Sequence, residues 1–482
     1  MPIKESIKPN LRFIHAYLII VAPLCLLQLE ANPTMAAVRG DKVNLTPALS
    51  TGDTYRVKVQ FELDGDLKLK AEGSQPAKSP VKVNAQLIYN EKTLQVHDGH
   101  RLAASAVRDY ESARATIKYR EGSVRPQLRE DRRIVAVAAD SPQDVVLFSP
   151  LGPLDRDELD LLNVPASSAL VDVILPGRSV AVGETWKLDS DWLAPLLGLD
   201  AVDHSSVVCT LQRVDKNLAV IHAQGTVTGS VEGVSSQLSV AAKISFDTQL
   251  KRITWFAMSL KESRAVGHAY PGLEATARVQ MAVQRQVNVP ALHNEVLADL
   301  NLKPDEPARL LEFHSPSGGF EMLLDRRWHV MIERADVSVL RLVDRGDLVA
   351  QVNFSALPKL KEGETFSIVD FQQDVKRALA DHFGEFVTAS ESVTDHGLRV
   401  MRVVTTGQAK DLSIDWIYYH VTDEQGRRLS CVFTHEAELA ERFGACDQSV
   451  VSSLQFTDVT AGRVTDAAQR PSTAGAARQK KR

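Results

Sequence analysis

Residues 54–63 read TYRVKVQFEL, and apolar and polar side chains alternate along the whole stretch. This period of two is typical of a β-strand with one buried face and one face in water. Beyond residues 64–66 the alternation resumes with the same parity at Leu67 and Leu69. A two-residue hairpin would turn the two apolar sets to opposite faces. We therefore expect either a three-residue loop here or one long bulged strand.

The clearest strand pattern follows in the middle of the chain, where short turn signals separate five consecutive segments. The predicted strands are Ser206–Val214, Leu218–Val231, Gln237–Phe246, Arg252–Arg264 and Glu274–Val287. Five consecutive strands indicate an antiparallel meander. With few helices, such a sheet is expected to be open and strongly curved or a partial barrel. Its concave face must then be covered by helices, a partner or an apolar ligand.

Weaker patterns lie before this meander. Further strands are predicted over Val81–Tyr89, Ala113–Tyr119, Arg132–Ala138 and Ala169–Leu175. Short helices are predicted over Asp155–Leu162 and over Trp192–Leu199, the second with Ser190 as its cap.

The pattern changes after a polar, proline-containing stretch at residues 290–307, which is typical of a linker. A helix is predicted from Ser367, its cap, to Gly384, because apolar residues recur there at spacings of three and four. Four strands are predicted before this helix, at Phe320–Leu324, Trp328–Glu333, Val337–Val343 and Leu348–Leu357. Four strands and a helical segment are predicted after it, at Phe386–Val393, Leu398–Thr406, Leu412–Thr422, Arg428–Thr434 and Glu436–Leu454. This order predicts an α+β sandwich.

A strand reading LSCVFT, residues 429–434, runs directly into the final helical segment. With this ending, the element order resembles the PsbP-like α/β/α sandwich family over about a third of the chain. The resemblance implies a binding or assembly module and brings no catalytic residues. The N-terminal part, with LPG at 175–177 and VGETW at 182–186, resembles uncharacterised secreted bacterial proteins, including those of planctomycetes.

The chain of 482 residues is too long for one hydrophobic core. We expect a mainly β protein with an α+β part: a curved antiparallel sheet or partial barrel followed by an α+β sandwich. The expected parts are a signal peptide (1–36), a β-rich antiparallel domain (37–289), a linker (290–307), a PsbP-like α+β sandwich (308–457) and a disordered basic tail (458–482).

The N-terminus has the charge order of an export signal. Lys4, Lys8 and Arg12 precede an apolar run from Phe13 to Leu29. A small-x-small pattern before Ala37 favours cleavage there, and an uncleaved anchor is the alternative. We therefore predict a protein exported to the periplasm or cell envelope, with secretion as the alternative.

Removal of this signal would leave three cysteines in a compartment that favours disulfides. Cys431 lies in a predicted strand, and Cys446 shares an apolar helical stripe with Val450 and Leu454. A Cys431–Cys446 disulfide would close a loop and stabilise the fold by ~3 kcal/mol. Two buried thiols that pack as small hydrophobic groups are an alternative of equal weight. Cys209 is expected only to pack in its strand.

One further strand carries aromatic residues on both faces. Trp416, Tyr418 and His420 share one face, and Ile417 and Tyr419 share the other. Either an exposed patch for a partner or packing under a helix would explain this pattern. Packing under a helix is our preferred interpretation.

The remaining signals argue against several classes of function. Lys and Arg total 56 against 61 Asp and Glu, for a net charge of −5, so nucleic acid is not an expected partner. Residues 229–233 (GSVEG) have serine one position too early for a hydrolase elbow, and residues 435–439 (HEAEL) lack the second histidine of a zinc motif. Glycine-rich phosphate loops are absent. We predict no catalytic, metal or cofactor-binding residues and no cofactor.

The leading hypothesis is a non-enzymatic exported envelope protein that acts in binding or assembly. Its partner would be an apolar small molecule held in the curved sheet or an envelope protein, and an uncleaved N-terminal segment would be its only membrane contact. Two alternatives stay open: an envelope hydrolase whose site assembles only in the fold, and a protein-interaction scaffold.

Overall fold

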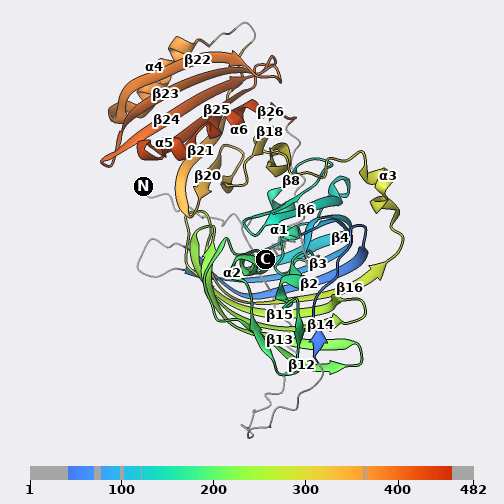
Figure 1. The fold of residues 1–482 in the computed structure, drawn as a ribbon. Coiled ribbons are helices and arrows are strands. Elements are labelled where there is room, and N and C mark those ends of the chain that lie inside the picture. The colour runs from blue at the N-terminus through green and yellow to red at the C-terminus, as the bar shows by residue number, and fades with distance from the viewer. Residues whose placement is uncertain are drawn as a thin grey trace, which may run out of the picture.

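The structure is a computed structural model that describes residues 42–69, 77–97, 102–120, 122–361, 364 and 366–458. A 13-stranded and a seven-stranded sheet dominate it (Figure 1). The predicted fold class is confirmed: the protein is mainly β, with a curved antiparallel sheet followed by an α+β part. The predicted signal peptide and almost all of the predicted tail lie outside the described residues. Within them, no helix has the length and apolar character needed to cross a membrane.

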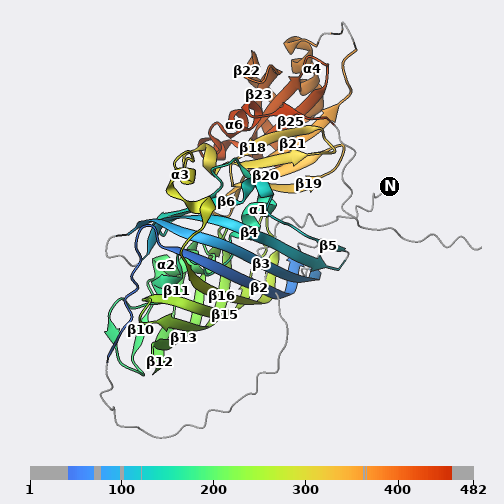
Figure 2. The same ribbon diagram turned by 90° about the vertical axis from the view of Figure 1, so that its right-hand side faces the viewer.

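The large sheet is antiparallel throughout, and the five predicted meander strands are confirmed as neighbours in it. Its long strands are β2 (Thr54–Leu69), β3 (Ala77–Val96), β4 (Ala103–Tyr119), β6 (Ile134–Ser141), β7 (Asp144–Phe148), β12 (Val208–Asp215), β13 (Leu218–Val231), β14 (Val234–Asp247), β15 (Arg252–Arg264) and β16 (Gly272–Gln286). Short β5 (Gly122–Val124), β10 (Thr185–Lys187) and β11 (Ala201–Ser205) complete it. Figure 2 shows β2 and β3 lying beside β15 and β16, because β16 pairs with β2.

The stretch from Thr54 to Leu69 is a single strand, so the prediction of one long strand is the correct alternative. Gly65 lies opposite Ala275 of β16 and Val81 of β3. A Cβ at Gly65 would lie 2.3 Å from the carbonyl oxygen of Glu274. The close approach of β16 therefore requires glycine at this position.

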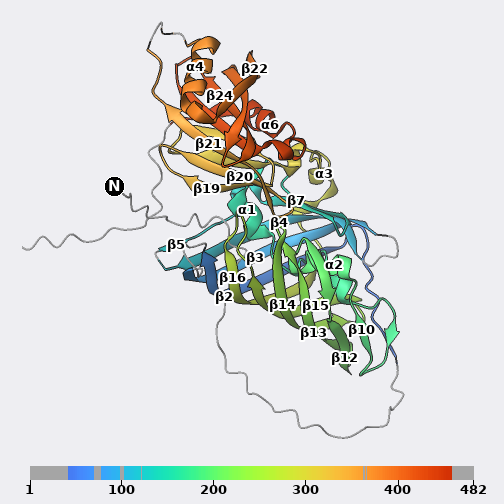
Figure 3. The same cartoon turned by 90° about the vertical axis from the view of Figure 1, so that its left-hand side faces the viewer.

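One face of the large sheet, the inner face, is covered by residues 154–199, which we call the inner segment (Figures 1 and 3). This segment contains α1 (Arg156–Leu162), the 3-10 helix η2 (Val171–Ile174) and α2 (Ser190–Leu197). Apolar side chains of all three helices belong to the same buried cluster as the sheet residues Val57 and Phe256. The concave face therefore already has a cover made of the chain itself.

The structure corrects one strand prediction in the inner segment and confirms one helix. The predicted strand Ala169–Leu175 is instead η2, because a short apolar run that is buried on several sides has no diagnostic period. The helix predicted over Asp155–Leu162 is confirmed as α1, with Asp155 in a capping box. The cap of α2 is Asp189 rather than Ser190.

The seven-stranded sheet forms the C-terminal domain. Its order is β19 (Trp328–Glu333), β20 (Ser338–Asp344), β21 (Asp347–Leu357), β25 (Arg428–Glu436), β24 (Leu412–Thr422), β23 (Arg399–Ala409) and β22 (Phe383–Val393). The helix α4 (Ile368–Leu379) covers one face, and α5 (Ala440–Phe443) and α6 (Cys446–Ser452) pack on the other. Ser367 caps α4 as predicted, but the helix ends at Leu379, before Gly384. The predicted final helix is broken at Gly444.

The aromatic face of β24 lies under a helix, as preferred from the sequence. Trp416 and Tyr418 pack against the apolar cluster of α4, and His420 stacks near Phe366 and Phe371 of the same side. This face therefore presents no patch to a partner.

The predicted linker residues pack on the large sheet. They include η3 (Pro290–Leu292), α3 (Asn294–Leu297) and the first residue of η4 (Pro307–Arg309). Leu292 and Leu297 are buried against Val107 and Ile134. The two domains also share a four-stranded sheet of β8 (Leu154–Asp155), β17 (Leu311–Ser315), β18 (Phe320–Leu324) and β26 (Gln455–Phe456). The remaining short elements are β1 (Val43–Asn44), β9 (Ser179–Val180), η1 (Glu130–Arg132), η5 (Ala380–His382) and η6 (Ala437–Leu439).

Candidate functional site

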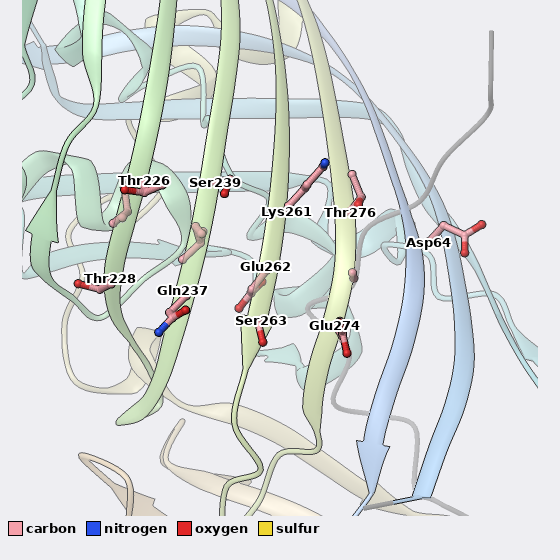
Figure 4. Close-up of a pocket in the computed structure, with 13 residues that line it drawn as sticks. Asp64, Thr226, Thr228, Gln237, Ser239, Lys261, Glu262, Ser263, Glu274 and Thr276 are labelled. Atoms are coloured by element: carbon pink, nitrogen blue, oxygen red, sulfur yellow. The ribbon is translucent and has the colours of Figure 1, made fainter. Parts of the chain in front are cut away.

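A hollow of about 650 Å³ lies on the open face of the large sheet, the face that points away from the inner segment (Figure 4). Strands place polar residues there because side chains alternate between faces: Gln237 and Ser239 are exposed, whereas Leu238 between them is buried. We call this site the polar hollow. Its polar lining consists of Asp64, Thr226, Thr228, Gln237, Ser239, Lys261, Glu262, Ser263, Glu274 and Thr276.

Strand register brings these residues together in rows. Ser239 lies opposite Lys261, and Lys261 lies opposite Thr276. Thr276 in turn lies opposite Asp64 of β2, which is far away in sequence. Thr226 of β13 lies opposite Ser239 and extends this row, so the site is built by pairing across five strands. Its short hydroxyl side chains leave space between the longer side chains.

The polar hollow has three acidic groups: Glu262 is buried and pairs with Arg264 at 2.7 Å, and the other two are held by lysines of β3. The Lys78 ammonium donates to the Glu274 carboxylate at 3.0 Å, and this hydrogen bond lowers the pKa of Glu274. Lys82 pairs with Asp64 in the same way. Lys261, in contrast, makes no ion pair or hydrogen bond within the described part of the chain. It is the cation of the site that is free to contact a partner.

The chemistry available in the polar hollow is that of binding. Hydroxyl, amide and ammonium groups can donate hydrogen bonds, and hydroxyl and amide oxygens can also accept them. The described lining residues include no histidine or cysteine, and all three carboxylates are engaged by lysine or arginine side chains. A nucleophile paired with a general base is therefore not assembled from these side chains.

The inner face of the same sheet carries charge of a different kind, on β3 and β4. Glu91 and Arg108 form a buried ion pair at 2.8 Å, with their side chains 4% and 2% exposed. Ser168 of the inner segment donates to Glu91 at 2.7 Å, and Arg108 donates to Ser167 at the same distance. Because each link joins sheet to segment, this network fixes the position of the inner segment.

A second group of charges lies in a cavity of about 290 Å³ between the two domains. Arg129 donates to Glu158 and to Glu312, both at 2.8 Å. Arg156 donates to the backbone carbonyl of Trp328 at 3.3 Å. These charged groups are engaged in joining the N-terminal domain to the C-terminal domain, so the cavity is a weaker candidate than the polar hollow.

The cysteines of the predicted disulfide lie on the α5–α6 side of the C-terminal domain. Cys431 is buried in β25, and Cys446 begins α6 beside the Arg327 side chain. Both are free thiols in the structure. Pairing in an oxidising compartment stays a prediction, and counting thiols in the denatured exported protein checks it: one thiol for the pair, three without it. Cys209 is buried, as expected.

The near-miss motifs have structural roles. Ser230 lies within β13, opposite Ser235, so residues 229–233 approach a hairpin and form no nucleophile elbow. His435 is buried and stacks on Phe443, with ring centroids 4.6 Å apart. No group of metal-type ligands occurs among the residues that the structure describes.

Sequence reasoning missed the polar hollow. The available signal was the run of exposed Ser, Thr and Gln at alternate positions of neighbouring strands. Local alternation gives the face of each residue, but the row from Ser239 to Asp64 depends on the pairing of β16 with β2, which brings together strands far apart in the sequence.

Comparisons with known proteins add only distant similarities. No protein-family model matches the sequence, and no curated protein matches it. The solved structure of the PsbP protein of the cyanobacterium Synechocystis (CyanoP) matches at 16% identity and a TM-score of 0.26, over 31% of this chain and 93% of that one. A Bacteroides thetaiotaomicron protein matches at 16% identity and a TM-score of 0.23, over 30% of this chain and 47% of that one. Lipovitellin matches at 9% identity and a TM-score of 0.28, over 54% of this chain, which spans only 28% of lipovitellin.

Proposed function

We propose that this chain is a non-enzymatic, exported binding component of the bacterial envelope, and that its polar hollow binds a partner protein. One observation carries the proposal: the inner face of the large sheet is filled by the chain itself, whereas the open face carries a large hollow lined by polar groups. The export signal supports the location, and its residues lie outside the described part of the chain.

The filled inner face argues against an apolar ligand as the partner. Such a ligand would have to displace the inner segment, whose leucines are buried with the sheet. Displacement would also break the contacts of Ser167 and Ser168 with Arg108 and Glu91. An apolar ligand in place of the inner segment would leave Glu91 and Arg108 buried without these hydrogen bonds, which is costly, so the open face is the favoured binding surface.

The lining of the polar hollow defines the surface it fits. Hydroxyl and amide groups from several strands suit a partner with backbone or side-chain hydrogen-bonding groups. Lys261 adds a positive charge at the centre, with Thr276 and Ser239 on either side. A protein with a polar, partly acidic surface meets both requirements, and its affinity would fall as salt screens Lys261.

Site-specific photo-crosslinking in the native cells tests this proposal. A photoreactive residue at Gln237, in the polar hollow, should give one discrete crosslinked protein. The matched control is Gln280, an exposed glutamine on the same open face outside the lining. Lys261→Glu should reduce the yield at Gln237 by roughly tenfold, equivalent to ~1.4 kcal/mol.

Three results would count against the proposal. Equal crosslinking from Gln237 and Gln280 would indicate a nonspecific surface. No crosslinked product at either position would exclude binding of a partner protein at this face. An apolar molecule released on denaturation of the purified native protein would instead favour the apolar-ligand hypothesis. N-terminal sequencing of the purified protein tests the export step separately, with a start near Ala37 expected.

A further inference from the structure

The strand β22 (Phe383–Val393) forms an edge of the seven-stranded sheet and is unusually exposed. It pairs with β23 on one side, and within the described residues no strand pairs with its other side. Val387 and Val393 are 54% and 69% exposed. An edge of this length presents a row of unpaired backbone N–H and C=O groups and is a template for another strand.

The other sheet edges of the two main sheets are short or covered. β10 has three residues, and β7 has five. Arg326 of the C-terminal domain donates to the backbone of Leu147 in β7 at 2.8 Å. β19, the opposite edge of the seven-stranded sheet, begins with the buried residues Trp328 to Val330. Among the described edges of these two sheets, β22 is therefore the edge strand that is both long and exposed.

The sequence of β22 lacks two of the usual protections of an exposed edge, although register shifts at Phe383/Glu385 and Phe386/Thr388 interrupt its pairing with β23. It reads FGEFVTASESV and contains no lysine and no proline. Glu391 is the charged residue nearest the C-terminal end of β22. Its carboxylate forms an ion pair with the Arg399 guanidinium of β23 at 2.6 Å. Figures 1 and 3 place β22 and α4 at the end of the C-terminal domain farthest from the large sheet, so the N-terminal domain does not cover this edge.

We propose that β22 is a homodimerisation edge: β22 pairs with β22 of a second copy of this chain, antiparallel, about a two-fold axis at Ser390. This inference goes beyond the proposed function and is independent of the polar hollow. The pairing joins the two seven-stranded sheets into one continuous sheet, and the backbone groups of both edges become hydrogen-bonded.

Complementarity of the strand with itself favours a second copy as the occupant. With the axis at Ser390, Val387 lies opposite Val393 of the other copy, and symmetry repeats this pair. These are the two most exposed valines of the strand, and they share a face because they are an even number of positions apart.

Neighbouring registers are less favourable. An axis at Glu391 would place that carboxylate opposite itself, and an axis at Thr388 would place Glu385 opposite Glu391. An axis at Ala389 would place Val387 opposite Glu391. The charge pattern thus selects the Ser390 register.

Single-cysteine crosslinking of the full exported chain tests the register. Ser390→Cys should form a disulfide-linked dimer under mild oxidation, because opposite residues have Cα atoms ~4.5–5.5 Å apart, within disulfide range. Thr388→Cys or Ser392→Cys alone should form no disulfide-linked dimer, whereas a mixture of the two should crosslink. The wild type is the blank, since its described cysteines are buried or half-buried.

A charge exchange tests the dimer without any crosslink. The measurement is the dissociation constant from analytical ultracentrifugation over a concentration series. Val387→Lys and Val393→Glu should each weaken the dimer at least about tenfold. The double variant should recover most of this loss, because the introduced lysine of one copy then lies opposite the introduced glutamate of the other copy. Leu412→Lys, at another exposed apolar residue of this domain, is the matched control and should change nothing.

A wild type that is monomeric at every concentration would overturn the proposal. A dimer that is indifferent to both single variants would also overturn it. Crosslinking of Thr388→Cys with itself would exclude the register at Ser390. A monomer whose Ser390→Cys variant crosslinks to a different protein in cells would assign the edge to another chain instead of a second copy.

Discussion

The two faces of the large sheet are made by the same strands and differ completely in what they hold. On the inner face, charged groups such as Glu91 and Arg108 are buried and matched by partners from the inner segment. On the open face, Lys261 is exposed and the lining is polar. A charge therefore fixes structure where water is excluded and is available for binding where water is present.

The largest expected effect comes from removing one member of the buried pair. Arg108→Met should lower the free energy of unfolding by about 3–5 kcal/mol, because Glu91 would keep a buried charge without its main partner. The matched open-face change is Arg56→Met, which removes a partly exposed pair with Glu111 and should cost about 0–1 kcal/mol. Urea unfolding followed by circular dichroism measures both.

Equal losses for the two variants would contradict this contrast between the faces. The double variant Glu91→Gln/Arg108→Met provides a further check. It should be more stable than Arg108→Met alone, because no unpaired charge is then left buried.

The next effect depends on pH and again belongs to the inner face. Burial raises the pKa of Asp172 to about 6 from its ordinary 3.8, although Arg252 lies 3.7 Å away. The folded state therefore holds this proton more tightly than the unfolded state. The resulting stabilisation is complete below pH ~4 and is lost as the pH rises through about 6, with a span of up to ~3 kcal/mol.

Asp172→Asn should flatten this part of the stability curve. Unfolding free energies of the wild type and the variant, measured by urea titration from pH 4 to pH 7, give the comparison. A variant with the same slope as the wild type would mean that Asp172 titrates normally. Asp66→Asn, on the partly exposed part of β2, is the control for the removal of a carboxylate outside the inner face.

A smaller effect is expected at Gly65, where the inner side of β2 meets β16. Gly65→Ala should destabilise the fold by about 1–3 kcal/mol, because the new Cβ would meet the backbone of Glu274 and Ala275. Asp66→Ala next to it should change stability by less than about 0.5 kcal/mol. Thermal unfolding measures both, and a Gly65→Ala variant as stable as the wild type would mean that the strands can move apart.

Much of the local structure followed from the residues alone. Alternation assigned the strands of the meander and the buried face of each, and the spacing of Phe371, Val375 and Leu379 placed α4. The Asp155 capping box was visible as a helix start. The strand prediction for Ala169–Leu175 was wrong. The residues of this stretch are buried on several sides, so their periodicity carries no information about the backbone conformation.

The apolar side of each strand could be predicted from the residues, because it depends on a two-residue period within the strand. Only the tertiary structure decided that β16 pairs with β2, that residues 154–199 fill the concave face, and that β22 is an open edge. The same holds for the polar hollow, whose rows join β14 to β2. These features depend on contacts between residues far apart in the chain, which local pattern does not encode.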